Sequence, residues 1–412
     1  MIKLTKPGFV KLPGSKSILN RLLLISTMLD QPLRFRNFAD CNDISTLSDN
    51  LFTLGFEISD RQEFWEIAAT HLPPQKVKLH ILDSATALRF FLARLCVWEG
   101  LAFQLDASPQ LKARPIQPLI SVLQELGADI AGSTFPFQIT SRKLPGGTCS
   151  VPANISSQFI SSLMLIAPLL ENGLTILLEA EIVSRNYILM TQKMMQAFGV
   201  KVTFQNSKIE IPGGQKYGQN GIFDVEPDFS TAGYFWAMGA LAENWIATDA
   251  WSEASWQADY GFWQILQRMG AEVKFQNEMI WLKHGRLHGI DVDMITMPDQ
   301  VPTLAVLALL ADSPTIIRNI GHLHFKESDR IASLLTEFRK ISADIRYRAN
   351  SLVIQPGLQI ASDTILDAHH DHRIAMSLYL LKILYPQLTI TGMESVQKSY
   401  PQFITACTKI LT

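Results

Sequence analysis

The apolar residues of this chain recur in one pattern, an amphipathic helix followed by a glycine or serine and then by a short strand. Two clear copies read Leu-Gln-Glu-Leu-Gly-Ala-Asp-Ile at 123–130 and Leu-Gln-Arg-Met-Gly-Ala-Glu-Val at 266–273. The turn residues of five copies are 72, 72, 71 and 72 positions apart: Gly55, Gly127, Gly199, Gly270 and Ser342. A glycine that caps a helix is common, so the caps alone carry little weight. The spacing instead indicates a duplicated α/β unit of about six elements, used about six times.

Six such units predict two lobes of three. A stretch rich in glycine and proline at 212–221 precedes Glu226 and Pro227, and it suits a crossing between lobes. We expect a first lobe at 13–226 and a second lobe made of 1–12 together with 227–412. The last repeat is short, and we expect the N-terminal strand to complete it. Ligands of a two-lobed protein are expected in the cleft between the lobes.

The composition excludes several classes of protein. Of the 412 residues, 47% are hydrophobic and 18% are charged, so a large core can form and disorder is not expected. The net charge of −2 argues against a general binder of nucleic acid or membrane surfaces. The four cysteines show no paired spacing and are expected to be free thiols. The apolar stretches are too short to span a bilayer and no signal core is visible, so we expect a cytoplasmic protein that is a monomer.

Polar residues gather where helices are predicted to begin. Pro-Gly-Ser-Lys-Ser at 13–17 precedes an apolar run, and free backbone N–H groups, the helix dipole and two cations would converge there on an anion. Arg114-Pro115 is also predicted to open a helix, because proline suits the first helical position. Eight basic residues share such places, which indicates a focused site for phosphate or carboxylate groups: Lys16, Arg21, Arg89, Arg114, Lys326, Arg330, Arg373 and Lys398.

Each of these motifs also has a structural interpretation. A capped helix with solvated charges fits residues 13–21, an ordinary N-cap fits Ser-Ser-Gln at 156–158, and a solvated helix start fits 326–330. Asp299 lies between two prolines before an apolar helix and is a candidate for a carboxylate with a shifted pKa. The histidines around 369–372 could suggest a metal site, but no second cluster at ligand spacing supports one, and we expect none.

Taken together and in this order, the motifs resemble the 5-enolpyruvylshikimate-3-phosphate synthase family of enolpyruvyl transferases. The resemblance covers nearly the whole chain and rests on seven segments in the family's order: Gly14-Ser15-Lys16-Ser17 with Asn20-Arg21, Arg114-Pro115-Ile116, Ser156-Ser157-Gln158-Phe159, Tyr187 with Met190-Thr191, Lys326-Glu327-Ser328-Asp329-Arg330, Asp371-His372-Arg373-Ile374-Ala375-Met376, and Lys398-Ser399-Tyr400-Pro401.

The resemblance implies an α/β fold of two lobes, each with three β-α-β-α-β-β units and the active site between them. It implies transfer of the enolpyruvyl group of phosphoenolpyruvate to the 5-hydroxyl of shikimate 3-phosphate, without metal or organic cofactor. Shikimate 3-phosphate would contact Ser17, Arg21, Ser156, Ser157, Gln158, Ser184, Tyr187 and Lys326. Phosphoenolpyruvate would contact Lys16, Ala85, Arg89, Arg114, Arg330, Arg373 and Lys398. Asp299 would be the base for the hydroxyl, and Glu327 and Lys16 are the candidates to protonate the methylene carbon.

The chain departs from the family at several positions. The family commonly has Asn-Ala-Gly-Thr where this chain has Asp83-Ser84-Ala85-Thr86, so Asp83 adds negative charge near an anion site. Lysine is common in place of Arg185, and asparagine is common in place of His322 and His370. None of these changes removes a group that the reaction needs. The resemblance also implies that glyphosate would inhibit poorly, because sensitive members have glycine where this chain has Ala85.

Three rival functions remain open. An enolpyruvyl transferase acting on a UDP-sugar usually carries a reactive cysteine on a mobile loop, but residues 108–113 read Ser-Pro-Gln-Leu-Lys-Ala. An enzyme that processes nucleic-acid ends would need a broader basic surface. A non-catalytic anion-binding scaffold would need neither Asp299 nor Glu327.

Overall fold

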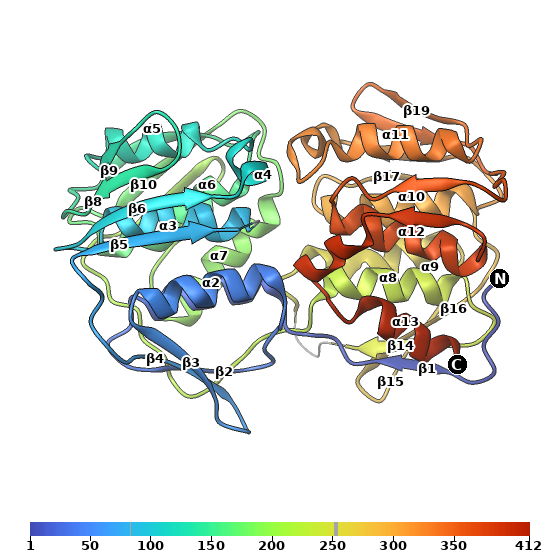
Figure 1. Cartoon of the computed structure of the whole chain (residues 1–412), viewed down its shortest axis with the longest axis horizontal. Helices are drawn as coiled ribbons and strands as arrows, with labels where there is room; N and C mark the ends of the chain where they lie inside the picture. The colour runs from blue at the N-terminus through green and yellow to red at the C-terminus, as the bar shows by residue number, and fades with distance from the viewer. Residues whose placement is uncertain (83, 251–253) are drawn as a thin grey trace. The chain divides into compact units, whose positions relative to one another are not determined.

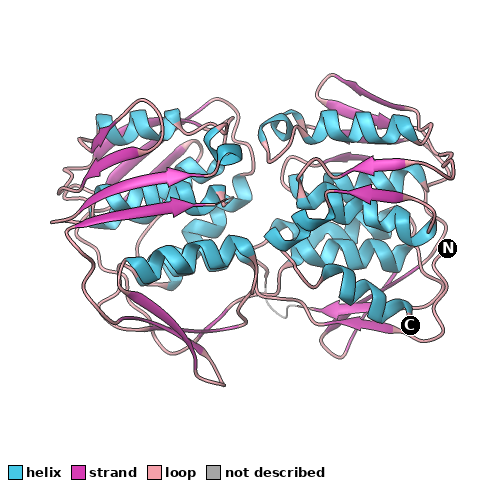
Figure 2. Ribbon diagram, in the orientation of Figure 1, coloured by secondary structure: helices cyan, strands magenta, loops and turns pink. Residues whose placement is uncertain are grey.

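The structure is a computed structural model that describes residues 1–82, 84–250 and 254–412. Asp83, which the sequence places near an anion site, lies outside the described residues. The chain divides into two compact units, one of Gly14–Glu226 and one of Met1–Pro13 with Pro227–Thr412. They are called the 14–226 unit and the 227–412 unit below. Both units combine helices with short strands, as the colours of Figure 2 show.

The 14–226 unit contains three repeats. The first consists of α1 (Lys16–Ser26), β2 (Leu33–Arg36), α2 (Asn42–Thr53), β3 (Phe56–Asp60), β4 (Trp65–Ala69) and, from the end of the unit, β13 (Phe223–Asp224). The second consists of β5 (Lys76–Ile81), α3 (Ala85–Cys96), β6 (Ala102–Ala107), α4 (Pro109–Lys112), α5 (Gln117–Glu125), β7 (Asp129–Ala131) and β8 (Phe137–Thr140). The third consists of β9 (Gly147–Pro152), α6 (Ser157–Ile166), β10 (Leu174–Glu179), α7 (Arg185–Ala197), β11 (Thr203–Gln205) and β12 (Lys208–Ile211), with a 3-10 turn at Ala167–Leu169.

The 227–412 unit also contains three repeats. The first consists of β1 (Gly8–Val10), α8 (Phe229–Ala240), β14 (Ile246–Asp249), α9 (Phe262–Arg268), β15 (Glu272–Gln276) and β16 (Met279–Lys283). The second consists of β17 (Asp291–Asp293), α10 (Val301–Leu309), β18 (Thr315–Arg318), α11 (Arg330–Lys340), β19 (Ile345–Arg348) and β20 (Ser351–Ile354). The last consists of β21 (Ile365–Asp367), α12 (His372–Leu384), β22 (Thr389–Thr391) and α13 (Phe403–Leu411). Its 3-10 turns are Ala258–Gly261, Pro298–Gln300, Gly321–Phe325 and Met393–Lys398.

One sheet topology recurs through the described residues. Five four-stranded sheets have the order first, second, fourth, third, as in β5-β6-β8-β7. The first two strands run parallel, with Leu79 opposite Leu105, and the other pairs are antiparallel. The predicted α/β repeat is therefore confirmed.

The prediction for the N-terminal strand was wrong. β1 pairs in parallel with β14, so it completes the first repeat of its unit and not the last. The last repeat has a two-stranded sheet of β21 and β22. The end of the chain still lies against its beginning, because a Cβ added at Gly8 would meet the side chain of Ile410 on α13. β13 plays the matching part in the other unit by pairing in parallel with β2.

The inner helices of the 227–412 unit are apolar on all sides. Every residue of α8 and of α10 is buried, and these two helices pack against each other and against α12 (Figure 1). In the 14–226 unit α3 packs against both α1 and α6. A helix buried all round can expose polar groups only at its ends. The starts of these helices are therefore where polar side chains can gather.

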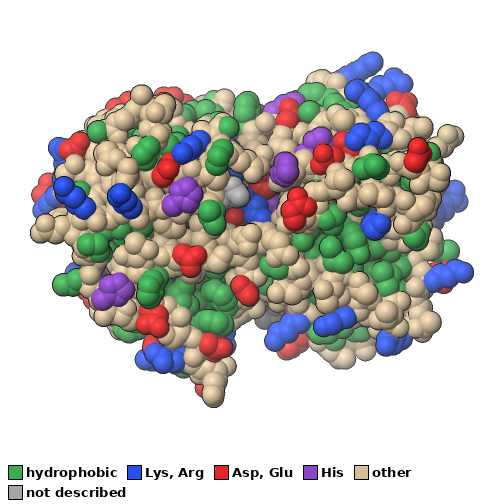
Figure 3. Space-filling model, in the orientation of Figure 1, with side chains coloured by type: hydrophobic (Ala, Val, Ile, Leu, Met, Phe, Trp, Pro, Cys, Tyr) green, Lys and Arg blue, Asp and Glu red, His purple; other side chains and the backbone are tan. Residues whose placement is uncertain are grey.

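The turn residues found in the sequence have the expected conformation. Gly55, Gly127, Gly199 and Gly270 have φ of +95°, +97°, +83° and +109°, and Ser342 has +55°. The four cysteines are free and buried, which confirms the prediction of free thiols. The charged side chains on the face that Figure 3 shows are of both signs and interspersed.

The fifth turn has Ser342 in the left-handed conformation, which is less favourable for serine than for glycine. Because a left-handed residue with a Cβ costs roughly 1–2 kcal/mol, we expect Ser342→Gly to raise the free energy of unfolding by about 1 kcal/mol. Gly199→Ala should lower it by a similar amount, since nothing lies within 4 Å of the added Cβ and only backbone strain acts. Urea unfolding of both variants tests this, and a Ser342→Gly variant less stable than wild type would contradict it.

Candidate active site

The basic side chains of the first half of α1 are buried in the protein interior. Ser15 precedes the helix but makes no side-chain capping bond. Lys16 is buried, and its Nζ lies 2.7 Å from a carboxylate oxygen of Asp43 on α2. Arg21, one turn further along, is also buried. A capped helix with solvated charges is therefore the wrong interpretation of this motif.

Arg21 is a buried cation held by neutral groups. Its Nε donates to Thr191 Oγ1 at 2.7 Å, and its Nη atoms donate to the carbonyl oxygens of Ser17 at 2.6 Å and Tyr187 at 3.1 Å. Burial lowers the pKa of Arg21 to about 10. No carboxylate pairs with it in the part of the chain that the structure describes. An anion at this place would supply the missing charge.

A second group joins two repeats of the 14–226 unit. Arg89 on α3 donates to Gln158 Oε1 and, at 3.4 Å, to Ser156 Oγ, and its guanidinium lies 5.0 Å from the centroid of Phe159. Burial, followed by the charge of Arg114, lowers the pKa of Arg89 well below its usual range. Two guanidinium groups that repel each other, one of them beside a hydroxyl and an amide group, form a site that favours an anion.

Other predicted binding residues stand at the same kind of position. Ser156 caps α6 by accepting from the backbone N–H of Gln158 at 3.3 Å, and Ser157 is the first, buried residue of that helix. Ala85 is the first residue of α3 and is buried. Ser184 precedes α7 in the left-handed conformation, with φ of +53°.

Arg114 shows an error in the predicted boundaries. The helix that was expected to open at Arg114-Pro115 is α5, which begins at Gln117. The proline in its first turn is Pro118 and not Pro115. Both prolines suit a helix start, and local sequence does not choose between neighbouring positions.

Asp299 is the centre of the polar group in the 227–412 unit. It lies in the 3-10 turn before α10, with its carboxylate 2.8 Å from Arg330 Nη1 and 3.2 Å from Arg373 Nη2. Burial opposes the charge of Asp299, but the charges of Arg373, Lys326 and Arg330 hold its pKa well below the usual range. Asp299 is therefore an ionised carboxylate that can accept a proton.

Asp371 fixes the arginine that contacts Asp299. It is fully buried and accepts from Arg330 Nε at 2.8 Å. It also caps α12 by accepting from the backbone N–H of Arg373 at 2.8 Å. The runs at 326–330 and 371–373 were each expected to open a helix, and α11 begins at Arg330 and α12 at His372.

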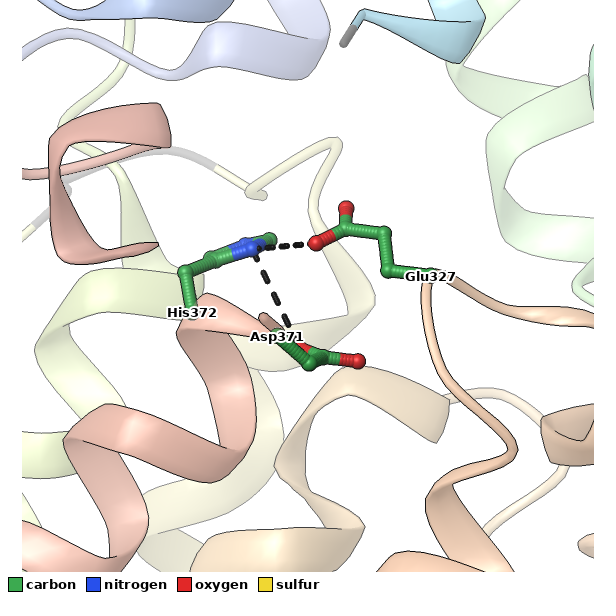
Figure 4. Close-up of side chains that lie close together, drawn as sticks. All are labelled: Glu327, Asp371 and His372. Atoms are coloured by element: carbon green, nitrogen blue, oxygen red, sulfur yellow. Dashed lines mark hydrogen bonds and ion pairs between the residues drawn. The ribbon is translucent and has the colours of Figure 1, made fainter. Parts of the chain in front are cut away.

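Glu327 lies between two other predicted groups. Its carboxylate is 2.7 Å from His372 Nδ1 and 3.5 Å from Lys398 Nζ. Figure 4 shows the imidazole of His372 directed at this carboxylate. Burial would raise the pKa of Glu327, but His372 and Lys398 hold it well below the usual range. Glu327 is therefore ionised here and can donate a proton only after it has received one.

Glu327, Asp371 and His372 also form the group of potential metal ligands found among the described residues, with atoms within 4.8 Å of one another. These atoms are engaged. Glu327 contacts His372, and Asp371 contacts Arg330 and caps α12. These three side chains are therefore part of a hydrogen-bonded network.

Three acids near these sites were missed in the sequence. Asp43 pairs with Lys16, Glu337 is buried on α11, and Asp259 lies in the 3-10 turn before α9 and accepts from Ser230 Oγ. None of them lies in a motif that the sequence singles out, because each is defined by neighbours from another repeat or element. His322 was noted only as a departure. It is buried, and burial together with the charge of Lys326 lowers its pKa to about 3, so its imidazole is neutral.

Comparison with known proteins identifies the family. A family model described as EPSP synthase (3-phosphoshikimate 1-carboxyvinyltransferase) matches residues 5–406. The chain belongs to the EPSP synthase family. A 3-phosphoshikimate 1-carboxyvinyltransferase of Photobacterium damsela subsp. piscicida is 35% identical over 408 residues, which are 97% of this chain and 95% of that protein. One of Vibrio atlanticus is 34% identical and covers 96% of this chain and 95% of its own length.

Solved structures share the fold. EPSP synthase from Acinetobacter baumannii matches with a TM-score of 0.80 at 23% identity, covering 99% of this chain and 96% of that one. The enolpyruvyl transferase NikO from Streptomyces tendae matches with a TM-score of 0.76 at 16% identity, with the same coverage. The predicted α/β fold and family are thereby confirmed. The chain is a transferase of the shikimate pathway that moves the enolpyruvyl group from phosphoenolpyruvate to shikimate 3-phosphate. Among the described residues no helix is long and apolar enough to cross a membrane.

Asp259 gives a pH-dependent prediction. Burial, followed by the charge of Asp299, raises the pKa of Asp259 to about 6 from 3.8, while Arg373 and Ser230 oppose the rise and Asp228 adds to it. Between these pH values the folded state holds a proton that the unfolded state releases, so this group lowers stability as the pH rises. Asp259→Asn keeps an acceptor for Ser230 and removes that titration.

We therefore expect the variant to gain stability relative to wild type as the pH rises from about 4 to 7, by roughly 1–3 kcal/mol. Urea unfolding of both proteins across this range measures the difference. A difference that is the same at every pH would contradict the prediction.

Proposed function

We propose that residues of the 14–226 unit bind the phosphate-bearing acceptor of this transferase reaction. The buried charge of Arg21, met only by neutral groups among the described residues, supports this assignment and is the observation that carries it. Shikimate 3-phosphate would take the place of the absent counter-charge. The proposed set is Ser17, Arg21, Ser156, Ser157, Gln158, Ser184 and Tyr187, with Lys326 from the 227–412 unit.

We assign phosphoenolpyruvate to the remaining cations. Arg89 and Arg114 repel each other, and the phosphate or carboxylate of phosphoenolpyruvate would relieve that repulsion. The proposed set is Lys16, Ala85, Arg89, Arg114, Arg330, Arg373 and Lys398. Eight cations over both sets suit two substrates that carry several anionic groups.

Asp299 would act as the base. Its carboxylate is held by Arg330 and Arg373, so its position is fixed before substrate arrives. It would take the proton of the 5-hydroxyl while that oxygen attacks phosphoenolpyruvate. The two arginines would stabilise the negative charge of the transferred group.

Glu327 or Lys16 would protonate the methylene carbon of phosphoenolpyruvate. Protonation makes the neighbouring carbon electrophilic, the hydroxyl adds to it, and a tetrahedral intermediate forms. Loss of phosphate with return of the proton gives the enolpyruvyl ether. For Glu327 the proton can arrive through the 2.7 Å hydrogen bond with His372. For Lys16 the neighbouring group is Asp43, whose carboxylate oxygen lies 2.7 Å from the Nζ atom.

Phosphate release with shikimate 3-phosphate and phosphoenolpyruvate tests the function. A UDP-sugar acceptor replaces shikimate 3-phosphate in a parallel assay. With phosphoenolpyruvate present in both assays, we expect turnover with shikimate 3-phosphate and none with the UDP-sugar. Turnover with the UDP-sugar and none with shikimate 3-phosphate would favour the rival transferase.

Asp299→Asn should lower kcat by about 10²-fold or more, because the amide keeps the shape but cannot accept the proton. The KM values should change much less. Steady-state kinetics with both substrates checks this, and Asp293→Asn, at an exposed acid on β17, is the control. A kcat within a few-fold of wild type would remove Asp299 from the base role.

Glyphosate should inhibit this enzyme poorly. It would occupy the phosphoenolpyruvate site, and the methyl group of Ala85, buried at the start of α3, would take up space that the longer inhibitor needs. Overpacking a tight site costs about 1–3 kcal/mol, so Ala85→Gly should bind glyphosate about tenfold more tightly or better. Inhibition constants at matched saturation with phosphoenolpyruvate give the comparison. Equal sensitivity of the two proteins would contradict the steric explanation.

A further inference from the structure

The turn before α12 is strained. Ala368 O accepts from the backbone N–H of Asp371 at 2.9 Å, and the two residues between them, His369 and His370, have φ of +52° and +53°. A tight turn with both central residues left-handed normally contains asparagine or glycine. Two histidines at these positions carry backbone strain that the surroundings must hold.

Glu337 on α11 contacts the residue that precedes this turn and the first of its two left-handed residues. Its Oε2 accepts from the backbone N–H of Asp367 at 2.8 Å, and its Oε1 lies 2.8 Å from His369 Nε2. Lys340, one turn along the same helix, contacts Oε2 at 2.7 Å. The carboxylate of Glu337 is 1% exposed. Among the described residues, this buried acid thus contacts its own helix, the end of β21 and the turn, and it ties the turn to α11.

The next residue of the chain is Asp371, which carries the network of the 227–412 unit. Arg330 and Glu337 are seven residues apart on α11, which is two helical turns, so they lie on one face of the helix. Arg330 contacts Asp371 itself and Glu337 contacts the turn that leads into it. The two contacts together fix where α12 begins.

We propose that Glu337 is a positioning residue for the transfer reaction, which holds the 367–370 turn in its strained conformation and thereby places Asp371, His372 and Arg373. It touches no substrate. It acts through Asp371, which orients Arg330 against Asp299, and through the first turn of α12, where His372 meets Glu327. The inference rests on the proposed roles of these residues.

A merely structural acid would stabilise α11 without affecting turnover of the folded enzyme. In Glu337→Gln the amide offers one acceptor to the three groups that now face two carboxylate oxygens, so the turn loses part of its support. We expect kcat to fall by about ten- to a hundredfold, because small displacements of catalytic groups have effects of this size. The KM values should change by less.

The decisive variant leaves Glu337→Gln in place and stabilises the turn by changing the two turn residues themselves. His369→Asn with His370→Gly places Asn-Gly at the two left-handed positions, where the backbone prefers this turn without outside support. Introduced into Glu337→Gln, this pair should restore most of the lost kcat. His288→Asn, which breaks a half-exposed 2.9 Å contact with Asp312 elsewhere in the same unit, is the control and should leave kcat unchanged.

All variants are assayed well below their unfolding temperatures, with kcat referred to the folded fraction measured by circular dichroism. The wild-type kcat tests the transferase function, and the ratios to it test the positioning role. If Glu337→Gln does not fold, Glu337→Asp, which withdraws the carboxylate by one methylene, is tested in the same way. A kcat within twofold of wild type, or a loss that the Asn-Gly turn does not restore, would overturn the proposal.

Discussion

The complete burial of the inner helices is the constraint on which the arrangement of functional groups depends. Every residue of α8 and α10 is buried, and in α1, α3 and α6 every residue except the second of each helix is buried. A polar side chain in the middle of such a helix needs a partner from another helix, as Arg21 has in Thr191. The first turn of a helix instead offers free backbone N–H groups and the positive end of the dipole. Most of the groups proposed to bind or react therefore lie at a helix start or within its first two turns. Because one supersecondary unit is repeated, each repeat supplies helix starts at which binding groups can lie.

The two units stabilise their buried cations in opposite ways. In the 14–226 unit, burial lowers the pKa of Arg21 and Arg89, because neutral groups surround Arg21 and another cation acts on Arg89. In the 227–412 unit, Asp371, Asp299 and Glu327 outweigh burial and raise the pKa of Arg330. Among the described residues, Arg21 and Arg89 therefore contact only neutral groups, whereas Arg330 contacts two carboxylates. This difference agrees with a phosphate-binding role for the first and with acid and base roles for the second.

The sequence predicted those features of the fold that depend on residues close together in the chain. The 72-residue period, the left-handed turns and the starts of α1, α11 and α12 depend on neighbouring residues, and the structure agrees with them. The place of the N-terminal strand was missed, since β1 and β14 are far apart in the chain and several sheets offer an edge. Asp259 and Glu337 were missed for a related reason. An isolated acid has no pattern, and its role follows only from the Ser230 or His369 that folding brings to it.

Left-handed residues occur both at the repeat turns and before two helices of the proposed sites, but with different side chains. Four of the five turns that end helices at the repeat spacing contain glycine, which adopts the left-handed conformation without steric cost. The turns that lead into α7 and α12 have Ser184, His369 and His370 in that conformation instead. A glycine there would relieve the strain but would remove a hydroxyl or imidazole from the start of a functional helix. At the start of α12 the strained conformation is held by a neighbour, Glu337, which contacts His369. Other left-handed residues that are not glycine, such as Asn277 with Glu278 and Ala349 with Asn350, connect neighbouring strands. The conformation alone therefore does not mark a functional helix start, and the contacts that hold it decide whether a turn positions reacting groups.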